Sequence, residues 1–222
     1  MGSENKNILL DFYLSKSHDN YSELMTNDKV TKMENALSYG KEYWDGGKPE
    51  GYGGYKYDGR WSSVANKIID FYNLTYKSKV LEIGCGKGFL LFELQKILPG
   101  LDVVGIDASK YAIDNAKKEV KNCIIIQKAN DPSLFKKNEF DLVLCIGTLH
   151  DLYINELKET LAEIDRVGKN KFVVVESYRT IRELFNLQCK AITNKLFLSK
   201  HEWIFIFNEF GYEGDYSFRY FE

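Results

Sequence analysis

The sequence lacks the features that mark membrane, secreted and disordered proteins. Among its 222 residues there are only three prolines, and no apolar run is long enough to span a bilayer. The polar start MGSENKN has none of the apolar core of a secretory signal peptide. We therefore expect a soluble, cytoplasmic protein that does not bind a membrane.

Patterns typical of metal sites and disulfides are also missing. The four cysteines, at positions 85, 123, 145 and 189, include no CxxC pair and show no ligand-like spacing with the three histidines. Cys123 and Cys145 stand in apolar runs, where a thiol behaves as a small hydrophobic side chain. We expect reduced, structural cysteines and no metal.

The charges show no excess of one sign. Lys and Arg number 30 against 32 Asp and Glu, for a net charge of −2. A nucleic-acid partner is therefore not expected, because such proteins are usually basic. The length and the 44% hydrophobic content suit one globular domain of ordinary size with an extension.

From Lys79 onward, short β-like runs alternate with helical stretches. Most of these runs are nearly continuous in Val, Ile and Leu, as in strands buried on both faces of a parallel sheet. The alternation predicts an α/β fold with a Rossmann-like, doubly wound and mostly parallel sheet. Strands are expected at residues 80–83, 102–106, 123–127, 140–146 and 171–176. Helices are expected at residues 64–72, 89–98, 109–120 and 154–167.

The two ends of the chain differ from this pattern. Residues 1–61 are expected to form an N-terminal segment that is helical to about Tyr39 and then rich in glycine and aromatic residues, while residues 62–222 form the sheet domain. Near the other end, Ser199 is placed to cap a helix that runs to about Phe210 and stops at Gly211. One strand, at residues 216–221, completes the chain.

The stretch VLEIGCGKG, residues 80–88, places a glycine-rich loop directly after the first strand. Such a loop lets backbone approach a ligand closely. A dinucleotide loop, GxGxxG, needs its third glycine where this chain has Phe89. A phosphate loop needs Ser or Thr after its lysine, whereas Lys87 is followed by Gly88. Neither phosphate-binding pattern is therefore matched in detail.

Residues 81–88, LEIGCGKG, resemble motif I of the class I S-adenosylmethionine-dependent methyltransferases. Asp107 follows 19 residues after Gly88 and ends the second strand, where an acid accepts the two ribose hydroxyls of a nucleoside. KAND at residues 128–131 and FDLVLCIGTLHDL at residues 140–152 match the later motifs in order. The resemblance covers about residues 62–178 and implies S-adenosyl-L-methionine as the cofactor.

The resemblance also implies a set of cofactor-binding residues. Three of the motifs that contribute to this set also have a simpler interpretation. Glu82 can be a strand-end acid, Asp107 a helix cap, and Asn130-Asp131-Pro132 an ordinary turn. The aromatic N-terminal segment is interpreted as a lid over the site, or alternatively as a loop packed on the sheet edge. The expected cofactor-binding residues are Tyr57, Trp61, Glu82, Gly84, Cys85, Gly86, Gly88, Asp107, Ala108, Asn130, Asp131, Cys145 and Ile146.

The loop after the fourth strand bears on the methyl acceptor. Methyltransferases that act on base amines usually carry [DNS]-P-P-[YFW] there, whereas this chain reads Ile-Gly-Thr-Leu-His. Nucleobase N-methylation is therefore disfavoured. His150 is a candidate general base because of its near-neutral pKa, and a capping or packing histidine is the alternative.

Three stretches resemble a small-molecule subgroup associated with bacterial sugar and surface-glycan biosynthesis: GYGGYKYDGRW (51–61), TLHDLY (148–153) and VVVESYR (173–179). Gly147 departs from the asparagine that this subgroup often has. Arg179 follows the fifth strand and is placed to bind a carboxylate or phosphate, or else is a surface arginine. The expected substrate-binding residues are Tyr52, Tyr55, Arg60, Tyr178 and Arg179.

The sequence therefore predicts a methyltransferase that acts on a small polar acceptor, with a sugar or sugar-nucleotide hydroxyl first. A carboxylate or phosphoryl acceptor that needs no base is the alternative, as is a non-catalytic protein that only binds the cofactor. The family usually ends in a hairpin of two strands. Only 12 residues follow Phe210, so we expect a shortened hairpin with a single good strand.

Overall fold

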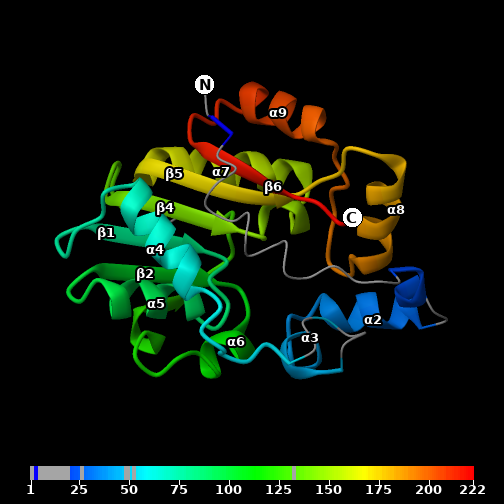
Figure 1. Cartoon of the computed structure of the whole chain (residues 1–222), viewed down its shortest axis with the longest axis horizontal. Helices are drawn as coiled ribbons and strands as arrows, with labels where there is room; N and C mark the ends of the chain where they lie inside the picture. Colours follow the sequence, from blue (N-terminus) through cyan, green and yellow to red (C-terminus); the bar gives the residue numbers. More distant parts are fainter. Residues whose placement is uncertain (1–2, 5–20, 26–27, 48–50, 52–53, 132–133) are drawn as a thin grey trace.

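The computed structural model describes residues 3–4, 21–25, 28–47, 51, 54–131 and 134–222, and its centre is a six-stranded sheet (Figure 1). The strands lie in the order β3-β2-β1-β4-β5-β6, and every neighbouring pair is parallel. The expected Rossmann-like α/β fold is confirmed. The strands are β1 (Lys79–Ile83), β2 (Asp102–Asp107), β3 (Ile124–Ile126), β4 (Phe140–Ile146), β5 (Gly168–Glu176) and β6 (Asp215–Arg219).

Helices cover both faces of the sheet because alternate side chains of each strand point to opposite sides. In β1, Val80 belongs to the apolar cluster that α4 and α5 cover. Its neighbour Leu81 belongs to the cluster that α7 and α9 cover. These helices are α4 (Ser62–Phe71), α5 (Phe89–Ile97), α7 (Ile154–Val167) and α9 (Lys200–Glu209).

Helix α6 (Lys110–Asp114) is shorter than the helix expected over residues 109–120. Ser109 does cap it, since its Oγ accepts the Ala112 N–H at 3.0 Å. Beyond the helix, the Lys117 N–H donates to the Lys87 carbonyl at 3.1 Å, and Val120 is fully buried. The prediction of a long helix was wrong because this segment packs beneath the loop that follows β1.

The region between β4 and the last helix also differs from expectation. Strand β5 starts at Gly168, directly after α7, three residues before the predicted residue 171. Helix α8 (Ile181–Lys190) was not predicted. It begins after Thr180, whose hydroxyl accepts the Glu183 N–H at 3.2 Å.

The C-terminal prediction of a single strand is confirmed, but the strand spans Asp215–Arg219 instead of residues 216–221 and forms no hairpin, because it runs parallel to β5. Strand β6 pairs with β5 in parallel, and the described residues contain no second strand after α9. The Tyr216 N–H donates to the Ser3 carbonyl at 3.0 Å, and Glu4 forms an isolated bridge with Tyr216. Ser3 and Glu4 therefore lie against β6 (Figure 1).

The N-terminal segment contributes short helices beside α8 and α6 (Figure 1). They are η1 (Tyr21–Met25), α2 (Lys29–Ala36) and α3 (Lys41–Asp45). Tyr21 packs with Leu187, Cys189 and Phe221. None of the helices in the described part of the chain is both long enough and apolar enough to cross a bilayer.

Candidate active site

The glycine-rich loop stands at the carboxyl end of β1. Gly84, Gly86 and Gly88 have φ of +75°, +54° and +69°, a region that favours glycine. The N–H groups of Gly84 and Cys85 both donate to the Ile106 carbonyl, at 2.8 and 3.2 Å. The loop is therefore held against the end of β2.

Asp107 links this loop to the start of α6. Its Oδ2 accepts the Gly86 N–H and its Oδ1 accepts the Ser109 N–H, both at 2.7 Å. Burial raises the pKa of Asp107 against the lowering effect of these two hydrogen bonds. Each oxygen accepts one backbone donor and keeps a lone pair for another.

Glu82 adds a second carboxyl group beneath the loop. Its side chain is buried, and its Oε2 has no hydrogen-bond partner among the described residues. Burial, and then the nearby Asp107, raise the pKa of Glu82 well above its ordinary value. An unpaired buried acceptor costs folding free energy, about 1–3 kcal/mol, so such a group points to a ligand donor.

The loop after β4 faces the glycine loop. The Oγ1 of Thr148 lies only 2.0 Å from where a Cβ on Gly84 would stand. Gly147, with φ +79°, differs: no atom of the described residues lies within 4 Å of its own Cβ position. The end of β4 therefore has open space in front of Gly147.

His150 lies in η4 (Leu149–Asp151) and is only 4% exposed. Its Nδ1 accepts the Glu176 N–H at 3.2 Å, and its Nε2 lies 3.6 Å from the Glu176 carboxylate. An accepting Nδ1 places the proton of the neutral ring on Nε2. Both nitrogens thus face protein groups, so the base role stays a prediction and this arrangement favours a positioning role.

Glu176 ends β5, and its carboxylate is surrounded by hydrogen-bond donors, two of which are positively charged. Its carboxylate accepts from Lys190 Nζ at 2.6 Å, Asn194 Nδ2 at 3.0 Å and Arg219 Nη1 at 3.4 Å. Burial acts to raise the pKa of Glu176, but Lys190, His150 and Arg219 outweigh it and lower the pKa overall. The result is a buried, ionised carboxylate beside the imidazole.

Tyr178 and Arg179, expected to bind substrate, follow β5 at the same edge. The Arg179 guanidinium pairs with Glu183 and, at 2.6 Å, with Glu222, and it lies 4.1 Å from the centre of the Tyr220 ring. Tyr178 packs beside the Tyr21 cluster. Arg179 is therefore already paired with carboxylates of its own chain.

Comparison with known proteins then decides the family. A family model described as a methyltransferase domain matches residues 74–211. The protein belongs to this methyltransferase family. S-adenosylmethionine is the methyl donor of this family, in agreement with the cofactor that the glycine-loop motif implied.

Relatives agree with this assignment and differ among themselves in their acceptors. An uncharacterized methyltransferase of Synechocystis is 32% identical over 135 residues, which cover 60% of this chain and 62% of that protein. The tRNA U34 carboxymethyltransferase of Sulfurimonas denitrificans is 31% identical over 134 residues, which cover 57% of this chain and 44% of that protein. The methyltransferase thus spans less than two thirds of the length of these relatives. They give no support to the narrower resemblance to a sugar or glycan subgroup.

Solved structures support the fold alone, because their identities are low. The methyltransferase solved with the Trm112 activator of Haloferax volcanii has a TM-score of 0.56 at 18% identity, covering 84% of this chain and 77% of that one. A SAM-dependent methyltransferase of Archaeoglobus fulgidus has a TM-score of 0.55 at 19% identity, covering 77% of this chain and 72% of that one.

The carboxyl groups at the ends of β1 and β2 suit the hydrogen-bond donors of the cofactor. A ribose offers two hydroxyl donors, and the methionine portion offers an ammonium. The carboxylate of Asp107 has a free lone pair on each oxygen, and the Glu82 Oε2 is a buried acceptor without a partner among the described residues. We therefore expect Asp107 to hold the ribose.

Other expected cofactor residues lie nearby with different surroundings. The Cys85 and Cys145 side chains are buried in the core, so only their backbone faces the edge. Ala108 is exposed, and Ile146 packs partly into the core. In the turn after β3, the Asn130 amide donates to Glu159 at 3.1 Å, and the Asp131 carboxylate accepts the Lys128 N–H at 3.1 Å.

The aromatic residues of the expected lid pack on α5. Tyr55 stacks on Phe89 with ring centres 4.8 Å apart, and Tyr57 meets the edges of Phe89 and Phe92 while bonding Glu93. The Trp61 indole N–H donates to the Tyr55 hydroxyl at 3.0 Å. Arg60 pairs with its neighbour Asp58. Tyr52 lies outside the described residues.

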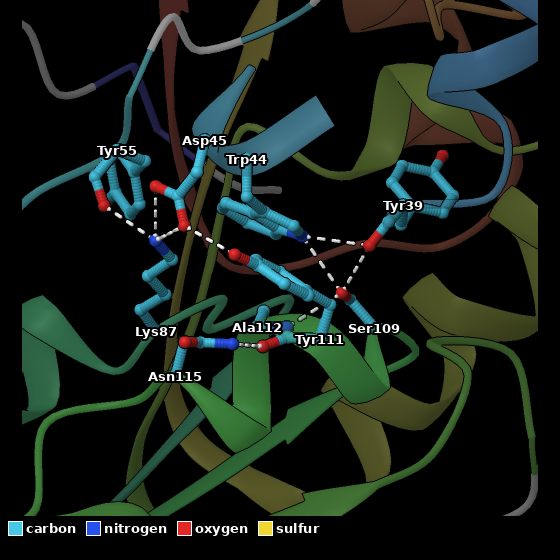
Figure 2. Close-up of polar contacts among 9 residues, drawn as sticks. All are labelled: Tyr39, Trp44, Asp45, Tyr55, Lys87, Ser109, Tyr111, Ala112 and Asn115. Atoms are coloured by element: carbon cyan, nitrogen blue, oxygen red, sulfur yellow. Dashed lines mark hydrogen bonds and ion pairs between the residues drawn. The ribbon is translucent and has the colours of Figure 1, made fainter. Parts of the chain in front are cut away.

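Sequence reasoning missed the group that contacts the glycine loop from the N-terminal segment (Figure 2). Trp44 of α3 lies against Gly86, its Cη2 being 2.7 Å from where a Cβ would stand. Asp45 pairs with Lys87 at 2.7 Å. The signal was weak, because α3 has five residues between glycines and its partners are over 40 positions away.

Proposed function

We propose that the methyltransferase acts on a small polar acceptor, with a hydroxyl of a sugar or sugar nucleotide as the first candidate. One observation carries this: the carboxyl ends of the central strands are covered. Helix α3 lies over the loops after β1 and β2. The chain after α8 lies over those after β4 and β5, with Lys195 N–H bonding the His150 carbonyl at 2.9 Å and Asn194 bonding Glu176.

These two covers meet, because Ile192 packs against the cluster of Ala36, Tyr43, Trp44 and Ala112. A macromolecular acceptor needs an open approach to the methyl group, whereas a small molecule fits under such a cover. The net charge of −2 also gives no general attraction to a nucleic acid.

Methyl transfer requires the protein mainly to position the methyl donor and the acceptor. When bound, the cofactor supplies an electrophilic methyl group on a sulfonium. The protein holds donor and acceptor about 3 Å apart and in line, which provides much of the acceleration. In this proposal Asp107 holds the ribose, the glycine loop holds the methionine portion, and the space before Gly147 admits the acceptor.

The proton of the acceptor separates the two candidate substrate classes. A neutral hydroxyl needs a base, and His150 is the proposed one, reaching the acceptor only if its ring leaves Glu176. An acceptor that is already a carboxylate or phosphoryl anion needs none. The engagement of both His150 nitrogens in this structure favours that second candidate.

A labelling experiment tests the proposal. The purified protein is incubated with methyl-labelled S-adenosylmethionine and, separately, with sugar nucleotides, free sugars, small carboxylates, phosphate esters, total tRNA and a protein extract. Label in a small-molecule fraction supports the proposal. Label that enters only RNA or protein contradicts it. If small molecules are labelled, the rate of His150→Ala with the best acceptor distinguishes a hydroxyl, which needs the base, from an anion, which does not.

A further inference from the structure

Trp44 crosses the position where the cofactor's ribose is expected. Its indole N–H donates to Ser109 Oγ at 2.9 Å and to the Tyr39 carbonyl at 3.1 Å, while the far edge of the ring lies on Gly86. Gly86 and Ser109 are the two residues whose N–H groups hold the Asp107 carboxylate. The indole therefore spans both sides of the ribose-binding acid.

Trp44 is held there by the ion pair and hydrogen bonds that its neighbour Asp45 makes with Lys87 and Tyr111, which we call the fastening. The Asp45 carboxylate accepts from Lys87 Nζ at 2.7 and 2.8 Å and from the Tyr111 hydroxyl at 2.9 Å (Figure 2). The Lys87 side chain is only 5% exposed, and its Nζ also donates to the Tyr55 carbonyl at 3.0 Å. Lys87 belongs to the glycine loop itself, so α3 is tied to the loop that binds the cofactor.

The indole and the fastening together close this side of the site. Trp44 is 6% exposed and Tyr43 8%, so α3 is packed rather than laid loosely on the surface. A ribose that reaches Asp107 must pass the indole, because the ring contacts both residues beside that carboxylate. Entry and exit of the cofactor therefore require α3 to lift.

We propose that Trp44 is a cofactor-contacting residue and that Asp45, acting through Lys87 and Tyr111, is the positioning residue that holds it closed. The cofactor exchanges only in the minor population in which this fastening is broken. Weakening the fastening then raises the rates of association and dissociation together, since both pass through the open state. The proposal rests on S-adenosylmethionine as the cofactor and is independent of the acceptor.

The test is stopped-flow measurement of S-adenosylhomocysteine binding and release, followed by tryptophan emission. Asp45→Asn leaves all three tryptophans in place and removes the charge of the fastening. We expect both rate constants to rise about 10-fold or more, and the Kd to change by less than either, because hydrogen bonds to charged groups are the stronger ones. Asp45→Glu, which keeps the charge, should restore part of the wild-type rates.

Asp114→Asn is the matched control. It removes an exposed pair on the neighbouring helix, Lys110–Asp114 at 2.7 Å, and should leave both rates unchanged. Unchanged rates in Asp45→Asn would overturn the proposal. A faster release with unchanged association would overturn it too, because Asp45 would then only add affinity. If Asp45→Asn does not fold, Tyr111→Phe replaces it and should shift both rates in the same direction by about 2–5-fold.

Discussion

Replacing Asp107 by alanine should reduce cofactor affinity far more than folding stability. The carboxylate is expected to hold two ribose hydroxyls, and a charge-assisted pair of this kind is worth about 2–4 kcal/mol. The Kd for S-adenosylhomocysteine should therefore rise by roughly 30–1000-fold, at about 1.4 kcal/mol per tenfold.

The stability of the folded protein responds to two opposing changes in this variant. The N–H groups of Gly86 and Ser109 lose their acceptor. Against this, folding raises the pKa of Asp107, so its ionised form opposes folding at pH values above that pKa, and alanine removes the opposition. We expect the free energy of unfolding to change by no more than about 2 kcal/mol.

Isothermal titration and urea unfolding measure the two effects separately. Asp102→Ala is the control, because this residue starts the same strand, is 62% exposed and lies 3.9 Å from Lys79. It should bind the cofactor as the wild type does. If Asp107→Ala binds within threefold of the wild type, the ribose is not held by this carboxylate.

Three further predictions concern the other parts of the site. Folding lowers the pKa of Glu176 below its ordinary 4.5, so its carboxylate stabilises the folded protein above that pH and loses this contribution as the pH falls further. The free energy of unfolding should therefore fall less steeply with acid in Glu176→Gln than in the wild type. Equal acid dependence in the two proteins would show that Glu176 is not a stabilising ionised carboxylate. His150→Ala should lower the free energy of unfolding by about 2–4 kcal/mol through a cavity and an unpaired Glu176 N–H. If the acceptor is a hydroxyl, this variant should also lower kcat by about 10²–10⁴-fold, whereas an anionic acceptor needs no base. In hydrogen exchange, α3 should gain protection with S-adenosylhomocysteine while residues 54–61 stay equally protected; a gain confined to residues 54–61 would make that stretch the moving part.

The elements that the sequence predicted best are those whose apolar pattern is strong and local. Strand β4 and helix α7 were predicted with their observed bounds, because one is a nearly unbroken apolar run and the other has a regular stripe. Helix α8 was missed because its buried face carries Glu183 and Asn186, which hide the period. Glu183 is satisfied by Arg179, just before the helix, and Asn186 by the Phe221 carbonyl, 35 residues later.

In the candidate site, too, the sequence predicted the residues whose spacing is local and missed those placed by distant contacts. The glycine loop and Asp107 were found because their spacing is set by two adjacent strands, and Gly86 and Asp107 do bond each other. The position of Trp44 depends on a contact across 65 residues with Ser109, which no local pattern encodes. The orientation of His150 likewise depends on Glu176, 26 residues later.

Another contact between distant parts of the chain joins the glycine loop to the loop after β4. Thr148, from the loop after β4, fills the space where any side chain on Gly84 would stand. The glycine loop, which we propose binds the donor, and the loop after β4, which we propose faces the acceptor, are therefore in direct contact, with no adjustable layer between them. In-line transfer tolerates little error in the distance between the reacting atoms. In this proposal, the absence of a Cβ at Gly84 sets the spacing between the two loops and also lets the cofactor approach. The open space at Gly147 lies one residue from the same contact.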